Sequence, residues 1–519
     1  MDKIKVLDCT LRDGGYINDW NFGERVIKQV IAQLIDANVD LIEVGFLRNC
    51  EYDKDKTLFN SIEELKRILP EDRKNSKIVA MALHNMYDID KLEENRGVID
   101  AIRVTFHDYD IEEGLEFCAR VKAKGYQVFT NPINLMGYSD EALLRLIDRV
   151  NQLTPYGFSI VDTFGSMSKN DLTRIYAICE NNLDKDIVLG LHLHENMAMA
   201  YSLAQTFLES RFSGRNCILD ASLNGMGRVP GNLCLELMAD YLNKNYGKKY
   251  GINHILDAIE EHIMPIKETA SWGYKTEYFL SAKYNLHRNY AEFLLEKGRL
   301  TSRDINQILA LISEEKKSAF DKDYIESLYR KFLNKKIDDS HSLEQLKRIF
   351  AGRKAAVLAP GKSLGVDRER IREEIAKADV VITTNFYYEE TSDFAFFSNS
   401  KRYDEYKHLN PAHQTILTSN ISADEADYKV DYYSLAEDHG RVSDNCGILL
   451  LRLLKRLGAA EVFLAGFDGF QKDEENYMQG YFKEFYKGEP DDNRKIAEEI
   501  RRIGEEIPVT FLTPSLYQM

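Results

Sequence analysis

The chain has 519 residues, a formal net charge of -16 at pH 7, and 44% hydrophobic and 29% charged residues. This length exceeds one ordinary domain, so we expect a large first domain and a smaller second one. The acidic balance disfavours the binding of nucleic acid. No apolar run approaches the roughly 20 residues of a membrane helix. Seven scattered cysteines without a CxxC pair argue against a disulfide framework and against a thiolate zinc site. The opening MDKIKVLD is charged where a signal peptide is apolar, so we expect a cytoplasmic protein.

A short β-rich run followed by an amphipathic helical pattern recurs eight times over the first half of the chain. Helical segments such as 24–38 and 112–125 suit right-handed crossovers between parallel strands. Eight such units favour a closed (β/α)8 TIM barrel with its active site at the carboxyl ends of the strands, and a doubly wound open sheet is the alternative. The expected strands are 5–11, 40–47, 77–83, 101–107, 126–133, 157–164, 186–194 and 217–225.

Polar residues gather at the ends of these expected strands, where they would face the barrel mouth. In the middle of a strand they would be buried, and burial without a partner is unfavourable. Arg12 and Asp13 end the first strand, and Glu43 lies in the second. His84 and His107 follow the third and fourth strands. Asn131, Asp162 and Thr163 end the fifth and sixth strands and are candidates for substrate binding, and His192 and His194 end the seventh. Asp220, Ser222 and Asn224 share one face of a regular eighth strand.

His192 and His194 are two residues apart in a strand, so their imidazoles project to one face about 7 Å apart along the chain and can chelate one ion. A lone HxH is more often packing, but an aspartate at another strand end favours a metal site. Such a set with open positions suits Mn2+, Mg2+ or Co2+, and Zn2+ is less favoured.

Arg12 and Asp13 would face opposite sides of a regular strand, so the chain must turn there, which Gly14 and Gly15 permit by accepting positive φ. Arg12 cannot be a metal ligand, but its guanidinium can stabilise negative charge that develops on a bound oxygen. The alternative is a salt bridge that closes the end of the barrel.

The ordered motifs DCTLRDGG, IEVGF, LHLHEN and GMGRVPGN resemble those of the DRE-TIM metallolyase superfamily, and within it most closely the 4-hydroxy-2-oxovalerate aldolases. The resemblance covers roughly residues 3 to 290. It implies that the metal ligands are Asp13, His192 and His194, that Arg12 stabilises an enolate, and that Glu43 supports this arginine. Asn232 matches a fourth ligand in some members, although it equally suits the N-cap of a helix over 233–242.

The resemblance implies a divalent-metal aldolase or lyase that works through a pyruvate-type enolate, with a small aldehyde as its partner. Only the sequence of the second domain suggests that this aldehyde is sugar-like. The aldolases carry a catalytic histidine where this chain has Tyr16, whose ordinary pKa near 10 makes it a poor base at neutral pH. His84 or His107 could replace it, or could be ordinary barrel histidines. Tyr278 roughly matches a tyrosine acid of the aldolases, with Tyr284 and Tyr290 as rivals.

Charged amphipathic helices follow over about 291–352 and form a helical linker between a barrel domain at 1–290 and an α/β domain at 353–519. The last domain opens as strand, glycine turn and helix, which predicts a Rossmann-like fold. A P-loop is excluded because GxxxxGK would need glycine at Ala356.

The second domain also resembles, more weakly, sialyltransferase-like domains that bind nucleotide sugars. That resemblance implies a pocket for a nucleotide or nucleotide sugar, with turns and helix caps of a purely structural domain as the alternative. The implied pocket residues are Gly361, Ser363, Asn385, Ser443, Asn445 and Asp468.

Three functions stay open. The first is the pyruvate-type aldolase, the second an acyl-CoA condensing synthase of the isopropylmalate or homocitrate kind, and the third a nucleotide-sugar-dependent transferase or binding module in the second domain. A homo-oligomer is compatible with each of them.

Overall fold

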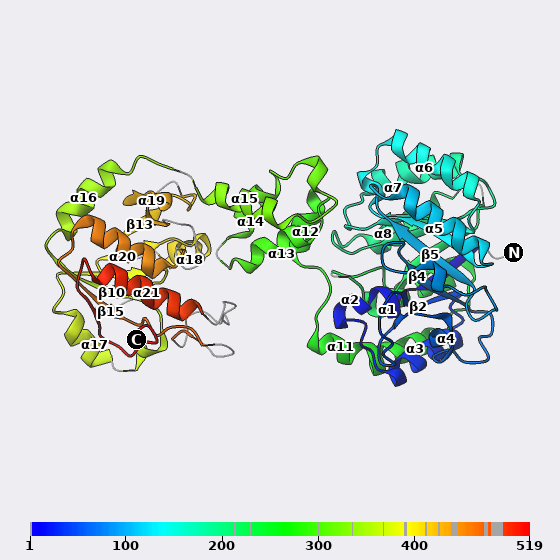
Figure 1. The fold of residues 1–519 in the computed structure, drawn as a ribbon, viewed down its shortest axis with the longest axis horizontal. Helices are drawn as coiled ribbons and strands as arrows, with labels where there is room; N and C mark the ends of the chain where they lie inside the picture. The colour runs from blue at the N-terminus through cyan, green and yellow to red at the C-terminus, as the bar shows by residue number, and fades with distance from the viewer. Residues whose placement is uncertain are drawn as a thin grey trace. The chain divides into compact units, whose positions relative to one another are not determined.

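The structure is a computed structural model, and it describes residues 3–211, 214–228, 230–298, 300–334, 336–366, 368–388, 392–409, 413–423, 426–436, 444–471, 476–478 and 491–518. The chain forms two compact units, coloured from blue to green and from green to red in Figure 1. The first comprises Met1–Ala291 and Ser313–Phe320, and the second comprises Glu292–Ile312 and Asp321–Met519. Among the described residues, no helix combines the length and the apolarity that crossing a membrane requires.

The first unit is an (β/α)8 barrel of eight parallel strands. The strand β1 (Ile4–Asp8) pairs with β2 (Leu41–Leu47) on one side and with β9 (Cys217–Ala221) on the other, which closes the sheet and excludes the open alternative. The two-residue strand β3 (Leu58–Phe59) extends the sheet beside β2. The other barrel strands are β4 (Lys77–Ala82), β5 (Ala101–Phe106), β6 (Gln127–Pro132), β7 (Gly157–Asp162) and β8 (Val188–Leu193).

Helices surround the barrel, and most of them carry an apolar stripe that is buried. Helix α3 (Glu24–Asp36) shows the pattern, with Ile27, Val30, Ile31 and Leu34 buried. The others are α4 (Ile62–Lys66), α5 (Ile111–Ala123), α6 (Asp140–Leu153), α7 (Lys169–Asn182), α8 (Ala200–Glu209), α9 (Leu235–Tyr246), α10 (Ile252–Ala258), α11 (Met264–Thr269) and α12 (Thr276–Lys283).

The barrel interior is built in layers. A buried apolar cluster combines residues of seven barrel strands or strand ends, among them Leu41, Ala101, Phe129 and Ile218. Side chains two residues apart in a strand point to the same face, so the next inward layer toward the carboxyl ends is fixed by the sequence. That layer consists of Glu43, Arg103, Asn131 and Asp220.

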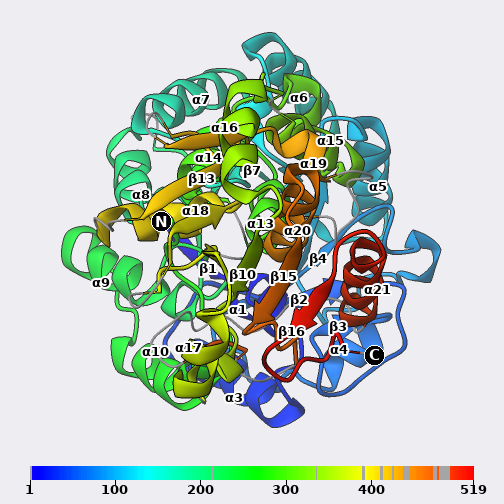
Figure 2. The same ribbon diagram turned by 90° about the vertical axis from the view of Figure 1, so that its left-hand side faces the viewer.

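The second unit is a parallel α/β domain. Its strands run in the order β14, β13, β12, β11, β10, β15, β16, so the order reverses at β10. Figure 2 shows β10, β15 and β16 side by side. Ligands of open α/β sheets bind where such a reversal leaves a crevice at the carboxyl ends of the strands. The strands are β10 (Lys354–Leu358), β11 (Val380–Thr384), β12 (Phe394–Phe397), β13 (Gln414–Thr418), β14 (Tyr428–Val430), β15 (Glu461–Ala465) and β16 (Val509–Phe511).

The segment expected as a helical linker is divided between the two units. Residues 313–320 lie with the barrel, whereas the flanking helices lie with the second unit, and α13 (Asn289–Glu296) spans the boundary. The helices of the second unit are α14 (Ser302–Leu309), α15 (Lys322–Leu333), α16 (Ser340–Phe350), α17 (Arg368–Ile375), α18 (Ser400–Tyr406), α19 (Tyr432–Ala436), α20 (Cys446–Leu457) and α21 (Asp492–Gly504).

Candidate metal centre

Asp13, His192 and His194 come together at the carboxyl ends of the barrel strands. Each offers one ligand atom, and these atoms lie within 4.8 Å of one another. All three residues are buried, and the two imidazole rings lie 5.0 Å apart between their centroids. The position of Asp13 depends on the single helical turn α1 (Thr10–Asp13), which begins soon after β1 ends at Asp8.

The glycines after Asp13 act differently from the prediction. Gly14 has a φ of -59°, and neither it nor Gly15 has a positive φ, so the expectation of left-handed backbone at this turn was wrong. The following short helix α2 (Gly15–Asn18) packs closely instead: a Cβ on Gly15 would overlap the indole ring of Trp20. Trp20 in turn donates its indole N–H to the carbonyl of Arg12 at 2.8 Å. Glycine is therefore required here for close packing against the turn.

Both histidines are oriented by acceptors behind the site. The Nδ1 atom of His192 lies 3.0 Å from Oδ2 of Asp220, and that of His194 lies 3.3 Å from the carbonyl oxygen of Gly231. Such contacts direct the other ring nitrogen toward a metal. Burial, followed by the nearby positive charges, lowers the pKa of His194 to about 3 despite the opposing charge of Asp13. This imidazole is therefore neutral at pH 7, the form that binds metal ions.

Asp13 is held as a carboxylate. Arg12 pairs with its Oδ1 atom, while Oδ2 accepts hydrogen bonds from Asn232 Nδ2 at 2.7 Å and from the backbone N–H of Arg228 at 3.2 Å. Burial by itself raises the pKa of Asp13, but Arg12 and the two histidines outweigh burial and hold the pKa below its ordinary value. An anionic ligand is thus available at neutral pH.

Asn232 tests whether a cation fits this donor set. Its Oδ1 atom is buried and has no hydrogen-bond partner among the described residues, although Nδ2 is bound to Asp13. Helix α9 begins at Leu235 with Cys234 as its N-cap residue, so the alternative of Asn232 as an N-cap was wrong. Two imidazoles, a carboxylate and a buried amide oxygen without a partner fit a divalent cation.

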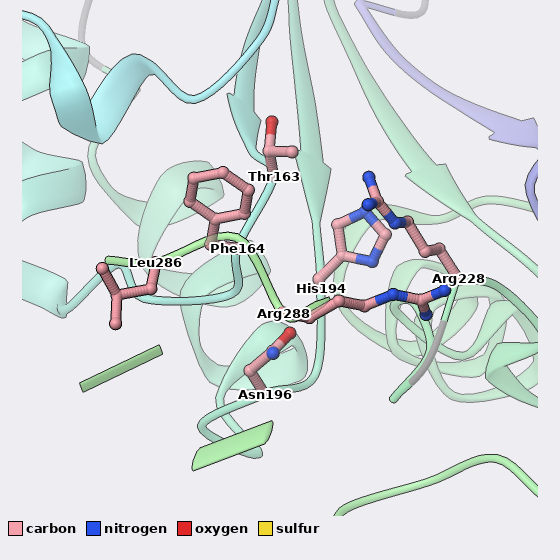
Figure 3. Close-up of a pocket in the computed structure, with 7 residues that line it drawn as sticks. All are labelled: Thr163, Phe164, His194, Asn196, Arg228, Leu286 and Arg288. Carbon is pink, nitrogen blue, oxygen red and sulfur yellow. The ribbon is translucent and has the colours of Figure 1, made fainter. Parts of the chain in front are cut away.

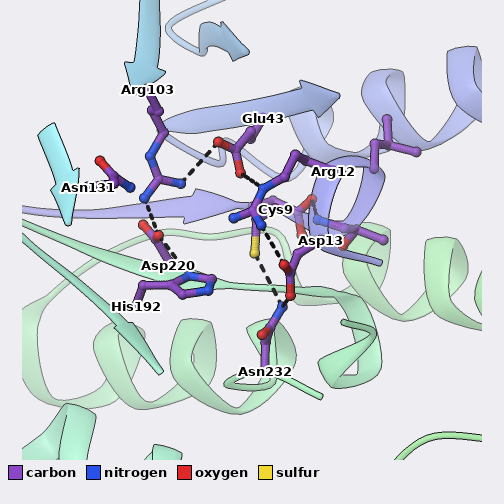
Figure 4. Close-up of polar contacts among 12 residues, drawn as sticks. Cys9, Arg12, Asp13, Glu43, Arg103, Asn131, His192, Asp220 and Asn232 are labelled. Carbon is purple, nitrogen blue, oxygen red and sulfur yellow. Dashed lines mark hydrogen bonds and ion pairs between the residues drawn. The ribbon is translucent and has the colours of Figure 1, made fainter. Parts of the chain in front are cut away.

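A chain of buried ion pairs connects Arg12 to His192 (Figure 4). Arg12 Nε donates to Glu43 Oε2 at 2.7 Å, and Arg103 Nη1 lies 3.2 Å from Glu43 Oε1. Arg103 also pairs with Asp220, which accepts from His192. Because both guanidinium groups and both carboxylates are almost fully buried, their charges must compensate one another.

Arg103 is a residue that the sequence reasoning missed. It lies in the middle of β5 in AIRVTF, where a charge was expected to be uncompensated. Its signal was present: Asp220 occupies the corresponding interior position of CILDA in β9. The expectation of a regular eighth strand through Asn224 was also wrong, because β9 ends at Ala221 and Asn224 has a φ of 50°.

The candidate acid and base residues lie in different surroundings. Tyr16 is 39% exposed on α2, and its ring lies 5.7 Å below the guanidinium carbon of Arg228. His84 and His107 both face Asp110, with His84 Nε2 2.8 Å and His107 Nδ1 3.5 Å from its Oδ2 atom. Tyr278 is buried on α12, and its carbonyl accepts from Asn196 Nδ2 at 3.3 Å.

The three candidates for substrate binding end β6 and β7. Asn131 is buried and accepts from Ser159 Oγ at 3.4 Å, while the hydroxyl oxygen of Thr163 accepts from the backbone N–H of Asn134 at 2.8 Å. Burial raises the pKa of Asp162 to about 7, although its carboxylate accepts from two backbone N–H groups. Thr163 is the one of these three that lines a pocket next to His194.

That pocket opens beside the metal centre (Figure 3). Arg228, which belongs to the GMGRVPGN segment, and Arg288, which precedes α13, both contribute to its wall. The sequence reasoning singled out neither arginine. The lining residues are Thr163, Phe164, His194, Asn196, Arg228, Leu286 and Arg288.

The second unit has a cavity of about 230 Å³ at the carboxyl ends of β10, β11 and β15. Ser363 does not line it but donates its backbone N–H to Asp468 Oδ2 at 2.8 Å, and Asn445 caps α20 by accepting from Ile448 N at 3.3 Å. Ser443 lies outside the described residues. The sequence candidates that line the cavity are Gly361, Asn385, Asn445 and Asp468.

The part of the chain that forms the barrel is similar to known proteins. The sequence profile of the HMGL-like family matches residues 3–261. An oxaloacetate decarboxylase of Mycobacterium tuberculosis is 24% identical over 50% of this chain and 76% of its own length. The 4-hydroxy-2-oxovalerate aldolase 2 of Comamonas testosteroni is 26% identical over 57% of this chain and 89% of its own length. A 2-isopropylmalate synthase of Oceanobacillus iheyensis is 22% identical over 46% of this chain, which spans only 47% of the synthase.

Among solved structures, an N-terminal domain from Bacteroides vulgatus is similar to the barrel with a TM-score of 0.50 and 24% sequence identity. The match covers 56% of this chain and 96% of that domain. It shows a shared fold.

Proposed function

Because this chain belongs through residues 3–261 to the HMGL-like family, within the DRE-TIM metallolyase superfamily, we propose that it is a divalent-metal-dependent lyase or aldolase. It would make or cleave a carbon–carbon bond through the enolate of pyruvate or a similar 2-oxo acid. The proposed second substrate is an aldehyde. Mn2+ or Mg2+ is the proposed metal, because a mixed nitrogen and oxygen donor set without thiolates suits such ions.

The observation that carries this proposal is the contact between Arg12 and Asp13, which belongs to the candidate metal-binding group of Asp13, His192 and His194. Arg12 is fixed by Glu43 on one side and by Asp13 on the other, so its positive charge stands beside a candidate metal ligand. A divalent cation bound by this group would polarise a 2-oxo acid and acidify the carbon next to its keto group. The charge of Arg12 would then stabilise the negative charge of the enolate.

The reaction in the direction of synthesis needs two proton movements. The methyl carbon of the 2-oxo acid loses a proton and forms a bond to the aldehyde carbon, and the aldehyde oxygen takes up a proton; cleavage is the reverse. We assign the proton transfer at this oxygen to His107, whose Nδ1 atom lies 3.5 Å from Asp110 Oδ2. His107 lies near the pocket wall: burial, and then the charges of Arg228, Arg288 and His107, lower the pKa of His287 to about 3, and His287 contacts Arg228 at 2.9 Å.

The proposal is tested by exchange of the methyl protons of pyruvate with deuterium. NMR would follow the exchange with Mn2+ or Mg2+ and with EDTA, and paramagnetic Mn2+ would be removed before recording. We expect metal-dependent exchange that Asp13→Ala abolishes. The matched control is Asp90→Ala, whose exposed side chain pairs with Arg120 on the surface.

If exchange fails, a different reaction becomes the leading proposal. Exchange without any thioester separates this activity from that of an acyl-CoA condensing synthase, a relation suggested by the similarity to 2-isopropylmalate synthases. If no metal supports exchange by the wild-type protein, the pyruvate aldolase is excluded and the thioester-dependent reaction becomes the next to test.

The cavity of the second unit favours a second candidate function, the binding of a nucleotide or nucleotide sugar. It lies at the reversal of the strand order, which is where open α/β sheets bind such ligands. Titration of the full chain with CMP and UDP by calorimetry tests this function. Binding that Asp468→Ala weakens would support it, whereas the absence of binding by both nucleotides would exclude these ligands.

A further inference from the structure

Three asparagines line one part of the cavity of the second unit. Asn385 directly follows β11, Asn399 follows β12 by two residues, and Asn445 directly precedes α20. They lie around the carboxyl end of β12. The backbone N–H of Asn385 donates to the carbonyl of Phe396 at 2.9 Å, and the Sγ atom of Cys446, next to Asn445, lies 3.9 Å from the same carbonyl oxygen.

Backbone hydrogen bonds fix the orientation of each of these amides. The Oδ1 atom accepts from a backbone N–H at 3.1 Å in Asn385, from two backbone N–H groups at 3.0 and 3.3 Å in Asn399, and from one at 3.3 Å in Asn445. Because an N–H can donate only to the oxygen, Nδ2 is the end of each amide that is left for a ligand. Among the described residues, none of the three Nδ2 atoms has a partner or belongs to the polar atoms that are buried without one.

The charged groups of the cavity wall are engaged with the protein itself. Asp468 is the one carboxylate among the described lining residues, and both of its oxygens accept from Ser363, one of them from the backbone N–H at 2.8 Å. The Nη1 atom of Arg402 lies 3.1 Å from Glu405 Oε2. The groups that face a ligand are therefore amide donors, and their complement is a group rich in oxygen acceptors. Hydrogen bonds from such donors are stronger when the acceptor is ionised.

Another part of the cavity wall is aromatic. Phe467 and Phe470 follow β15, which β10 and β11 separate from β12 in the sheet, and both line the cavity together with Tyr517. Gly447 keeps this part open, because a Cβ at this position would overlap the ring of Phe467. The cavity thus combines aromatic surface with a cluster of donors, as sites for small organic ligands with one polar end do.

From this arrangement we infer that the Nδ2 groups of Asn385, Asn399 and Asn445 bind an oxyanion of the ligand, either the phosphate of a nucleotide or the carboxylate of a 2-oxo acid. The inference rests on the second candidate function, the binding of a ligand in this cavity, and names the group that is recognised there. The carboxylate would belong to the class of product that we propose for the barrel, and the second unit would then bind what the barrel makes.

The first test compares ligands that differ in the oxyanion. Calorimetry of the full chain in EDTA, which keeps metal ions off the barrel, would use CMP with cytidine, UDP with uridine, and 2-keto-3-deoxygluconate, the adduct of pyruvate and glyceraldehyde. If the oxyanion is a phosphate, we expect the nucleotide to bind roughly 10- to 150-fold more tightly than its nucleoside, the factor for hydrogen bonds to a charged group. Binding of the sugar acid identifies a carboxylate instead. Equal affinities of nucleotide and nucleoside without binding of the acid, or no binding of any of these ligands, would overturn the inference.

Substitution by aspartate tests the amides themselves. Asn399→Asp and Asn445→Asp retain the Oδ1 atom that accepts from the backbone, and aspartate caps a helix as well as asparagine does, but the donor is replaced by a negative charge. We expect each variant to weaken binding of the oxyanion about 10-fold or more. Asn445→Ser, which retains a capping oxygen without the charge, should weaken it less. Gln414→Glu is the matched control, because it adds the same charge at the exposed amino end of β13.

The variants also distinguish failure of this inference from failure of the candidate function on which it rests. If a nucleotide binds to the wild-type protein and its affinity is unchanged in both aspartate variants, the cavity keeps its candidate function and the amide cluster loses its role. If neither the nucleotides nor the sugar acid binds to the wild-type protein, both are rejected. Exchange of the pyruvate methyl protons tests the barrel independently of either outcome.

Discussion

Replacing Arg103 with methionine would remove the cation at the centre of the buried network. Arg103, Glu43 and Asp220 are 1%, 0% and 2% exposed, so neither carboxylate can be rehydrated without opening the barrel. Removal of one partner from a buried ion pair typically costs about 3–5 kcal/mol of folding free energy. We expect Arg103→Met to lie toward the upper end, because two carboxylates lose the same partner.

The assay can be restricted to the barrel unit. The chain has two tryptophans, Trp20 and Trp272, and both lie in the first unit, so tryptophan fluorescence reports its unfolding. With a denaturant slope on the order of 3 kcal/mol per molar urea, the unfolding midpoint of Arg103→Met should fall by about 1 M or more. Arg120→Met is the matched control, because its exposed ion pair with Asp90 contributes at most about 1 kcal/mol.

A second substitution tests the cause of the loss. In Arg103→Met combined with Asp220→Asn, one of the buried charges left behind is neutralised, so part of the stability should return. The network does not act as a buried charge balance if Arg103→Met lowers the free energy of unfolding no more than Arg120→Met does. The same conclusion follows if the double variant loses as much stability as the two single variants lose together.

Three further predictions concern the metal centre and the proposed proton transfer. Asn232→Ala should weaken Mn2+ binding roughly 10-fold or more in calorimetry, because it removes both the unpartnered Oδ1 atom and a hydrogen bond to Asp13, and unchanged affinity would exclude Asn232 from the site. Because burial lowers the pKa of His194 from 6.5 to about 3, the unfolded chain binds a proton between these pH values that the folded chain does not. Stability of the metal-free barrel should therefore fall with decreasing pH in this window, and His194→Gln should reduce the slope by up to about 1.4 kcal/mol per pH unit in urea unfolding monitored by tryptophan fluorescence. His107→Gln should slow aldol addition roughly 100-fold or more if His107 transfers the proton, and a normal rate measured by pyruvate consumption would transfer that role to another residue.

The barrel was predictable because its signals are local and repeated. Each strand and helix shows its own periodicity, and closure follows from the number of parallel units. The grouping of Asp13 with His192 and His194 was expected for the same reason, since carboxyl ends of parallel strands meet at one mouth. The orphan oxygen of Asn232 was not predictable, because it depends on how the turn before α9 folds back toward Asp13.

The turn after β1 shows where local rules fail. Two consecutive glycines suggested left-handed backbone, but the chain continues as right-handed turns from Thr10 to Asn18. The requirement for glycine at Gly15 comes from Trp20, five residues later, whose indole occupies the space of a side chain. Conformational freedom and lack of volume are both properties of glycine, and only the packed structure shows which of them a position uses.

The position of Arg103 explains why the barrel interior and the candidate site cannot be separated. A rule that places polar residues only at strand ends treats each strand alone, whereas in a closed barrel the interior positions of β5 and β9 face one another across the axis. An arginine in one strand and an aspartate in the other can then neutralise each other, as Arg103 and Asp220 do. Because Asp220 also orients His192, the pair that makes a mid-strand charge tolerable also positions a candidate metal ligand. A shift of β9 by one residue would turn Asp220 out of the interior and remove both contributions together.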